Sequence, residues 1–339
     1  WQETPNGYIP TSPVFKGTIV RARVIKPGAL PSPIVTHTYF VTPEGAQRYT
    51  LPVLSLGIQE DYLYDYTSGI YVPGAVFDQW RQENPNANAN PSVLGNYSSS
   101  TEYPISFELF TTDGGRVLAQ NLGFRIHGGQ SRAVPQKSLR FYANAKYDTT
   151  DVLEYPIFTD LTDKIAGQPI TTFHRILLRN SGDDHNKTRM RDAFIQTLMK
   201  PMGLDGLAYQ PAVEFINGEY WGLINFRERL DRYYLASHYR IDPNDAALLE
   251  NNAELQEGDA TDVADFIALR TYIQDHDMAD SVNYAYAEAR MDMDNFVLYN
   301  VAEIYANNTD WPHNNIQFWR KRTPDTSPTA PPEHDGRWR

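Results

Sequence analysis

The order of strand and helix patterns along the chain constrains its fold more than any other sequence feature. Up to Arg227 the residues form short β-branched and aromatic runs separated by turns, and beyond it they show mostly helical periodicity. The clearest turn is Asn217-Gly218, a dipeptide typical of a tight β-hairpin. Helices are predicted for residues 229–239, 261–275, 279–290 and 292–307. We therefore expect an α+β protein with an antiparallel sheet in its N-terminal part and helices in its C-terminal part.

The predicted strands begin near the start of the chain. They cover residues 15–24, 34–41, 105–110, 116–120, 123–127, 137–142, 173–179, 211–216 and 220–226. Because two strands cannot form a stable domain alone, residues 1–43 are expected to be the tail of a small β-sandwich module, and residues 44–339 the main domain. Thr188 is predicted to cap a helix that ends at Met199. Residues 84–100, rich in Asn, Pro and Ser, predict a surface loop.

Composition excludes several classes of protein. The chain has 339 residues, of which 41% are hydrophobic, so a large core is expected. No run of about 18 apolar residues exists, so no transmembrane segment is predicted. A net charge of −12 argues against a nucleic-acid partner, and the lack of cysteine excludes disulfides and thiolate metal sites. The richness in Tyr, Asn and Pro favours a secreted or bacterial cell-surface protein.

A polar turn, Asp310-Trp-Pro-His-Asn-Asn315, follows the last predicted helix. An Asp five residues ahead of an Asn is the spacing of the protein kinase catalytic loop. There the Asp orients the attacking hydroxyl and the Asn binds a metal ion. Asp and Asn are also frequent in turns for conformational reasons, so the spacing needs support. That support would be a phosphate-binding lysine on an upstream strand and a second metal-binding aspartate on a downstream strand.

The upstream lysine is Lys137. It alternates with Leu139 and Phe141, so all three side chains should point to one buried face of the sheet. A buried lysine needs a carboxylate or phosphate partner, unless its stem runs along the strand edge to solvent. The preceding glycine turn can bring backbone amides close to a phosphate, or it can be a plain hairpin turn with exposed basic residues. Its candidate phosphate-binding residues are Gly128, Gly129, Ser131 and Arg132.

Two carboxylates are well placed to pair with Lys137. Glu228 follows the second strand of the Asn-Gly hairpin, and Asp192 lies early in the helix that Thr188 caps. Surface ion pairs with neighbouring arginines are the alternative for both. No Gly-x-Ser-x-Gly elbow supports a hydrolase, and any two of the 42 acidic residues remain candidates for a glycosidase pair.

Several stretches together resemble the spore-coat CotH-type kinases, a family of atypical protein kinases. In chain order they are Leu51–Leu56, Gly69–Tyr71, Gly123–Arg132, Pro135–Tyr142, Leu178–Asn180, Met190–Asp192, Asn217–Leu223 and Asn307–Asn315. The resemblance implies an atypical protein kinase-like two-lobe fold, with an antiparallel-sheet N-lobe and a helical C-lobe. It also implies ATP as phosphate donor, Mg²⁺ or Mn²⁺ (with Ca²⁺ as a further candidate), and Ser or Thr of secreted or coat proteins as acceptor. The first two strands resemble the end of a chitobiase/hexosaminidase C-terminal-type β module.

The resemblance assigns a role to each candidate residue. Asp310 would be the catalytic aspartate, Asn315 a metal ligand and Lys137 the nucleotide-phosphate lysine. The other residues that it groups with nucleotide binding are Gly128, Gly129, Ser131, Arg132, Glu228 and Asp192.

The family pattern continues beyond Arg339 into a strand ending in Trp-Asp-x-Asp, whose aspartate binds metal. Because the chain ends first, we expect a C-terminally truncated lobe and weak or no phosphotransfer by these 339 residues. The alternative function is a non-catalytic cell-surface scaffold or carbohydrate-binding protein, with a cell-surface polysaccharide as partner.

Overall fold

The computed structural model describes residues 13–86 and 94–339, which form two compact units. The first, called the barrel unit, contains the described residues up to Thr159, together with Thr171–Arg191 and Ala208–Glu228. The second, called the C-terminal unit, contains Asp160–Ile170, Asp192–Leu207 and Arg229–Arg339. Each unit therefore contains segments from separate parts of the sequence.

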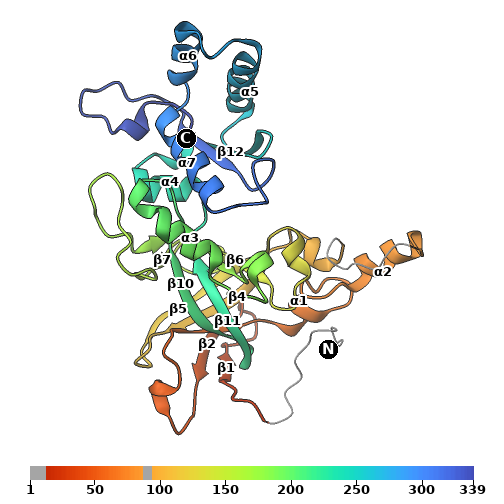
Figure 1. The fold of residues 1–339 in the computed structure, drawn as a ribbon. Helices are drawn as coiled ribbons and strands as arrows, with labels where there is room; N and C mark the ends of the chain where they lie inside the picture. Colours follow the sequence, from red (N-terminus) through yellow and green to blue (C-terminus); the bar gives the residue numbers. More distant parts are fainter. Residues whose placement is uncertain (1–12, 87–93) are drawn as a thin grey trace. The chain divides into compact units, whose positions relative to one another are not determined.

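The barrel unit is built around a closed seven-stranded barrel (Figure 1). Its strands, in order around the barrel, are β10 (Tyr209–Ile216), β11 (Glu219–Arg227), β9 (Arg175–Arg179), β6 (Ser138–Tyr142), β5 (Arg116–His127), β4 (Tyr103–Phe110) and β3 (Val53–Gly57). Neighbouring strands are antiparallel except β3 and β10, which pair in parallel with Val53 opposite Val213. Large apolar side chains from these strands are fully buried, among them Leu54, Phe107, Phe124, Phe141, Phe215 and Phe226.

Two predicted hairpins are confirmed. Asn217 and Gly218 both adopt positive φ, as a tight β-turn requires, and they join β10 to β11. The Asp113-Gly-Gly segment joins β4 to β5, with Gly114 at a φ of 87°. β5 is longer than predicted, because residues 116–120 and 123–127 belong to one continuous strand.

The expected kinase-like architecture, an antiparallel-sheet N-lobe with a helical C-lobe, is wrong for this structure. The N-terminal strands close into a barrel, because β3 pairs in parallel with β10, which follows it by about 150 residues in sequence. Strand and turn patterns report only local structure, so they do not reveal such a distant pairing. The C-terminal unit is also not purely helical, since it contains a three-stranded sheet.

The predicted N-terminal strands form an antiparallel pair, β1 (Thr18–Ala22) and β2 (Val35–Tyr39). Thr38 of β2 donates a hydrogen bond of 2.6 Å to Glu108 of β4, and Thr36 donates one of 2.7 Å to Ser106. Residues 1–12 of the predicted sandwich tail lie outside the described residues. The chitobiase-like resemblance is not shown, and the boundary after residue 43 stays a prediction.

The remaining elements of the barrel unit are short. They are α1 (Glu60–Tyr64), α2 (Gly74–Glu83), β7 (Leu153–Glu154) and β8 (Thr172–Phe173). The predicted surface loop at 84–100 includes residues 87–93, which lie outside the described residues.

The C-terminal unit contains the predicted helices and a sheet that the sequence did not predict. The helices are α3 (Arg191–Met199, whose first residue belongs to the barrel unit), α4 (Arg232–Tyr239), α5 (Ala260–Asp275), α6 (Ser281–Glu288) and α7 (Met293–Tyr305). The sheet has the order β13 (Glu254–Glu257), β12 (Ala246–Glu250), β14 (Gln317–Lys321). α3 begins after the predicted cap Thr188, whose hydroxyl instead donates to Asp184. In the described ranges, no helix is both long and apolar enough to cross a membrane.

Candidate functional site

Lys137 lies in the barrel unit directly before β6 and is only 2% exposed. Leu139 and Phe141 are fully buried as well, so the predicted burial of this alternating set is confirmed. The lysine does not extend to solvent, and its charged form is therefore held in a desolvated environment.

The ammonium group of Lys137 is surrounded by carbonyl oxygens and aromatic rings. Nζ donates hydrogen bonds to the backbone carbonyls of Arg132 (2.5 Å) and Val134 (3.3 Å). It also lies 4.4 Å from the ring centroid of Tyr97 and 5.2 Å from that of Tyr71. Burial lowers the pKa of Lys137 from its usual 10.5 to about 7, because desolvation disfavours the ammonium form.

The predicted ion pair between Lys137 and Glu228 is not formed in the described part of the chain. Glu228 is buried at the end of β11, where its Oε2 accepts a hydrogen bond of 2.9 Å from the backbone amide of Ala208. Asp192 lies in the C-terminal unit, half-buried in the first turn of α3. The roles of both carboxylates in nucleotide binding stay predictions.

Arg132 connects the glycine turn before Lys137 to a neighbouring loop through hydrogen bonds. The Arg132 guanidinium donates to the carbonyls of Gly128 (2.5 Å), Tyr97 (3.1 Å) and Ser98 (3.2 Å). Burial lowers the pKa of Arg132 below the usual range of a guanidinium group. Gly128 has a φ of 109°, and a side chain at Gly129 would meet no atom within 4 Å. There is thus open space beside the Gly129 backbone, next to the half-buried Ser131.

Tyr97 and Glu214 are features of this region that sequence reasoning missed, and Tyr71 was noticed only as part of a family motif. Glu214, on β10, is fully buried, and its Oε2 accepts a hydrogen bond of 2.9 Å from the side chain of Gln136. Its other oxygen has no hydrogen-bond partner among the described residues. Burial raises the pKa of Glu214 to about 7, although Gln136 and Arg189 act in the opposite direction. An acidic residue within a strongly apolar strand pattern is the signal that could have identified it.

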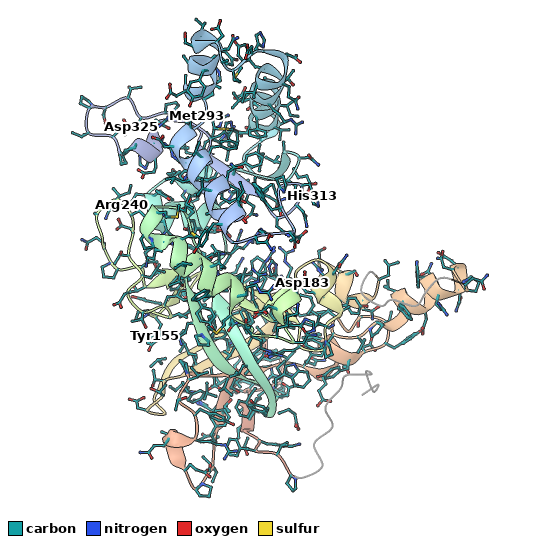
Figure 2. The ribbon with its side chains drawn as sticks, viewed as in Figure 1. Tyr155, Asp183, Arg240, Met293, His313 and Asp325 are labelled. Carbon is teal, nitrogen blue, oxygen red and sulfur yellow. The ribbon has the colours of Figure 1, made fainter. Side chains whose placement is uncertain are left out.

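The predicted catalytic loop lies in the C-terminal unit between α7 and β14. The Asp310 carboxylate accepts hydrogen bonds from the side-chain amides of Asn315 (2.5 Å) and Asn314 (3.1 Å). Asp310 and Asn315 are both exposed, and Asn315 has a positive φ of 57°. Figure 2 labels His313 within this loop. The structure therefore brings the predicted aspartate and asparagine into direct contact.

The donor atoms of this loop suit a hard divalent cation. Carboxylate and amide oxygens, such as those of Asp310 and Asn315, are ligands that Mg²⁺ and Mn²⁺ accept. In residues 13–86 and 94–339, no group of three or more His, Asp or Glu side chains is arranged to hold a metal. The loop thus fits as a contributor of one or two ligands.

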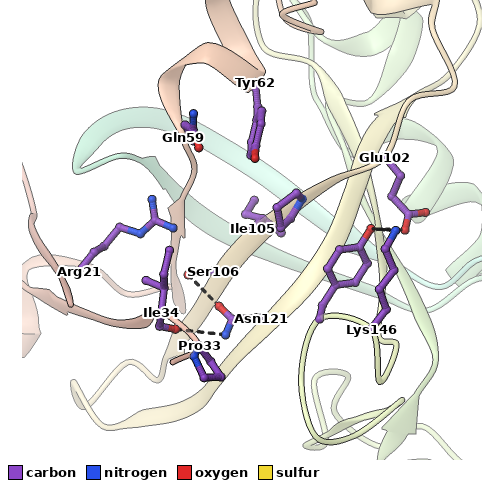
Figure 3. Close-up of a pocket in the computed structure, with 12 residues that line it drawn as sticks. Arg21, Pro33, Ile34, Gln59, Tyr62, Glu102, Ile105, Ser106, Asn121 and Lys146 are labelled. Carbon is purple, nitrogen blue, oxygen red and sulfur yellow. Dashed lines mark hydrogen bonds between the residues drawn. The ribbon is translucent and has the colours of Figure 1, made fainter. Parts of the chain in front are cut away.

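A separate cavity of about 430 Å³ opens in the barrel unit (Figure 3). Arg21 of β1 and the residues just before β2, Pro33 and Ile34, line it together with residues of β4 and β5. Two of its lining residues are joined directly, since Tyr147 donates a hydrogen bond of 2.7 Å to Glu102. None of the residues to which the sequence assigned a role lines this cavity.

A lysine that precedes a sheet strand and an Asp–Asn loop that follows a helix are parts on which phosphoryl-transferring proteins rely. The family model described as CotH kinase protein matches residues 124–339, which is more than half of the chain. The chain therefore belongs to the CotH kinase family. A search of curated proteins found no match. The matched residues include Lys137, Glu214 and Asp310, whereas Tyr71 and Tyr97 lie before them.

Proposed function

We propose that this chain is a protein kinase domain that uses ATP and a divalent metal to phosphorylate Ser or Thr of secreted or cell-surface proteins, with impaired phosphotransfer by these 339 residues alone. The observation that carries the proposal is the burial of Lys137 without a carboxylate partner in the described residues. A buried ammonium group that contacts only carbonyls and rings is suited to an anionic ligand. A phosphate oxygen is a stronger acceptor for it than a backbone carbonyl oxygen.

In this proposal the barrel unit provides the nucleotide-phosphate contacts. Lys137 binds the phosphates, and the open space at Gly129 lets a phosphate approach the backbone amides of the turn. The Arg132 guanidinium binds the backbone carbonyls of Gly128 and Tyr97 and so holds the turn in shape. Its contact with the nucleotide stays a prediction.

The loop of the C-terminal unit provides the groups for the acceptor and the metal. Asp310 orients the acceptor hydroxyl and takes its proton as the hydroxyl oxygen attacks the γ-phosphorus. The bond between the γ-phosphorus and the β–γ bridging oxygen breaks, and ADP leaves. Asn315 would hold the divalent cation, which neutralises charge on the phosphates when bound.

The first test is nucleotide binding by the full-length protein, measured as thermal stabilisation by ATP with Mg²⁺ or Mn²⁺. At an ATP concentration 100 times the Kd, binding stabilises the folded state by about 2.7 kcal/mol. Lys137→Ala should remove the stabilisation. Lys146→Ala is the matched control, because Lys146 is exposed and its ammonium group contacts only the Tyr147 side chain among the described residues.

Absence of stabilisation with either metal contradicts the proposal. That result favours the alternative, a non-catalytic scaffold or polysaccharide-binding protein that keeps the family's fold without its chemistry.

A further inference from the structure

Lys137 lies between two residues that are both hydrogen-bonded to one buried asparagine. Asn180, at the end of β9, is 2% exposed. Its Nδ2 donates 2.8 Å to the carbonyl of Gln136, the residue before the lysine. Its Oδ1 accepts 2.9 Å from the hydroxyl of Ser138, the residue after it. One side chain therefore binds the backbone of the residue before Lys137 and the side chain of the residue after it.

The same asparagine reaches further into the turn. Its Nδ2 also lies 3.4 Å from the carbonyl of Ser131, and its backbone amide donates 2.9 Å to the Ser138 hydroxyl. Oδ1 accepts a further bond of 2.9 Å from the Gly182 amide. The amide of Asn180 thus uses its donor side for the turn and its acceptor side for β6 and the following loop. No other common side chain of this size offers both functions at once.

We propose that Asn180 is a positioning residue that fixes Lys137 for phosphate binding. This inference rests on the proposed nucleotide-binding function. An ammonium group recognises phosphate only if its backbone is held in place, because a small displacement loses the contact. Gln136 is held on its other side as well, since its side chain binds Glu214 and Arg189 at 2.9 and 2.7 Å. Asn180 binds the main-chain carbonyl of Gln136, so both the side chain and the main chain of this residue are held in place.

The decisive variant is Asn180→Asp, which keeps the size and the acceptor oxygen but removes the two donors. The new carboxylate oxygen would face the carbonyls of Gln136 and Ser131, and the turn should shift away from it. Asn121→Asp is the matched control. Asn121 is a half-buried asparagine of the same barrel, and its side chain contacts Ser106 and Ile34.

Two measurements are made on the full-length protein. Calorimetry gives the affinity for ATP with Mg²⁺, and NMR of [¹³Cε]lysine-labelled protein without nucleotide gives the titration midpoint of Lys137. Its signal is assigned by its loss in Lys137→Arg. We expect Asn180→Asp to weaken ATP binding at least about tenfold, the equivalent of one or two lost hydrogen bonds. The Lys137 midpoint should move up from about 7 toward the ordinary lysine range as water enters. Asn121→Asp should change neither.

Unchanged ATP affinity in Asn180→Asp overturns the inference when the wild type binds ATP. If the wild type binds no ATP, the proposed function fails, and the NMR titration alone decides the positioning role. In that case, an unchanged Lys137 midpoint in Asn180→Asp overturns the positioning role of Asn180, and a raised midpoint supports it. Should Asn180→Asp fail to fold, as judged by circular dichroism, Ser138→Ala is measured in the same two ways and judged by the same outcomes.

Discussion

The ammonium group of Lys137 lies 4.4 Å from the centroid of the Tyr97 ring, a distance typical of a cation–π contact. Such a contact and two carbonyl hydrogen bonds only partly replace the water that the ammonium has lost. The pKa near 7 follows from that imbalance. At neutral pH the lysine is therefore close to its own titration midpoint, so a bound anion would shift its protonation.

ATP affinity should fall as pH rises from about 6 to about 9. Below pH 7 Lys137 is protonated before ATP binds, whereas above it the phosphate must draw a proton onto the lysine. Calorimetry in buffers of different ionisation enthalpy checks this, because proton uptake should grow with pH. In Lys137→Met, the part of the proton uptake that is due to Lys137 should vanish. In the control Lys146→Met, the proton uptake should equal that of the wild type. Equal uptake in wild type and Lys137→Met would refute the prediction.

Replacing the Tyr97 ring should make Lys137 harder to protonate. Tyr97→Leu removes a cation–π contact worth about 1 kcal/mol, so the Lys137 pKa should fall by roughly 0.7 unit. Tyr97→Phe keeps the ring and should leave the pKa within a few tenths of the wild-type value. NMR titration of the lysine Cε signal measures both variants. A Leu variant indistinguishable from the Phe variant would show that the ring contributes nothing.

Glu214 should make stability depend on pH in the acidic range. Its pKa is about 7 in the folded protein and near 4.5 when unfolded, so the folded state binds more protons between these values. Stability therefore falls as pH rises from about 4.5 to about 7, by up to roughly 3 kcal/mol. Chemical unfolding at pH 5 and pH 7.5 measures the change. Glu214→Gln cannot titrate, so it should lack this decrease. A decrease of the same size in the variant would assign it to other groups.

Asp310→Asn should reduce phosphotransfer without affecting the fold. Loss of a general base lowers turnover by at least about 10²-fold, whereas substitution of an exposed residue changes stability by about 0.5 kcal/mol or less. ATP affinity should be unchanged. The assay follows transfer of labelled γ-phosphate by the natural full-length protein to a Ser-rich acceptor protein. Asp294→Asn, an exposed aspartate of α7, is the control and should retain full transfer. Wild-type turnover in Asp310→Asn would remove Asp310 from the mechanism.

Local features were predictable from the sequence, and long-range ones were not. The Asn217-Gly218 turn, the helix before Asp310 and the burial of Lys137 all follow from residues within about ten positions of one another. The parallel pairing of β3 with β10 joins segments about 150 residues apart, and no periodicity encodes it.

The contacts of Lys137 also include long-range ones that the sequence did not predict. Tyr71 precedes the lysine by 66 positions, yet its hydroxyl accepts a hydrogen bond of 3.0 Å from the lysine's backbone amide. Asn180 was noticed only as part of a family motif, because its hydrogen bonds to Gln136 and Ser138 depend on the pairing of β6 with β9. The sequence therefore indicated which lysine matters but not what surrounds it.

The closed barrel has a practical consequence for anyone who shortens this protein. The residues that identify its family begin at position 124, after β3, after β4 and within β5. A protein trimmed to that start would leave one side of β10 without its partner β3. An open strand edge of this kind recruits other chains and leads to aggregation. The segment by which the family is recognised is thus shorter than the segment needed to close the barrel.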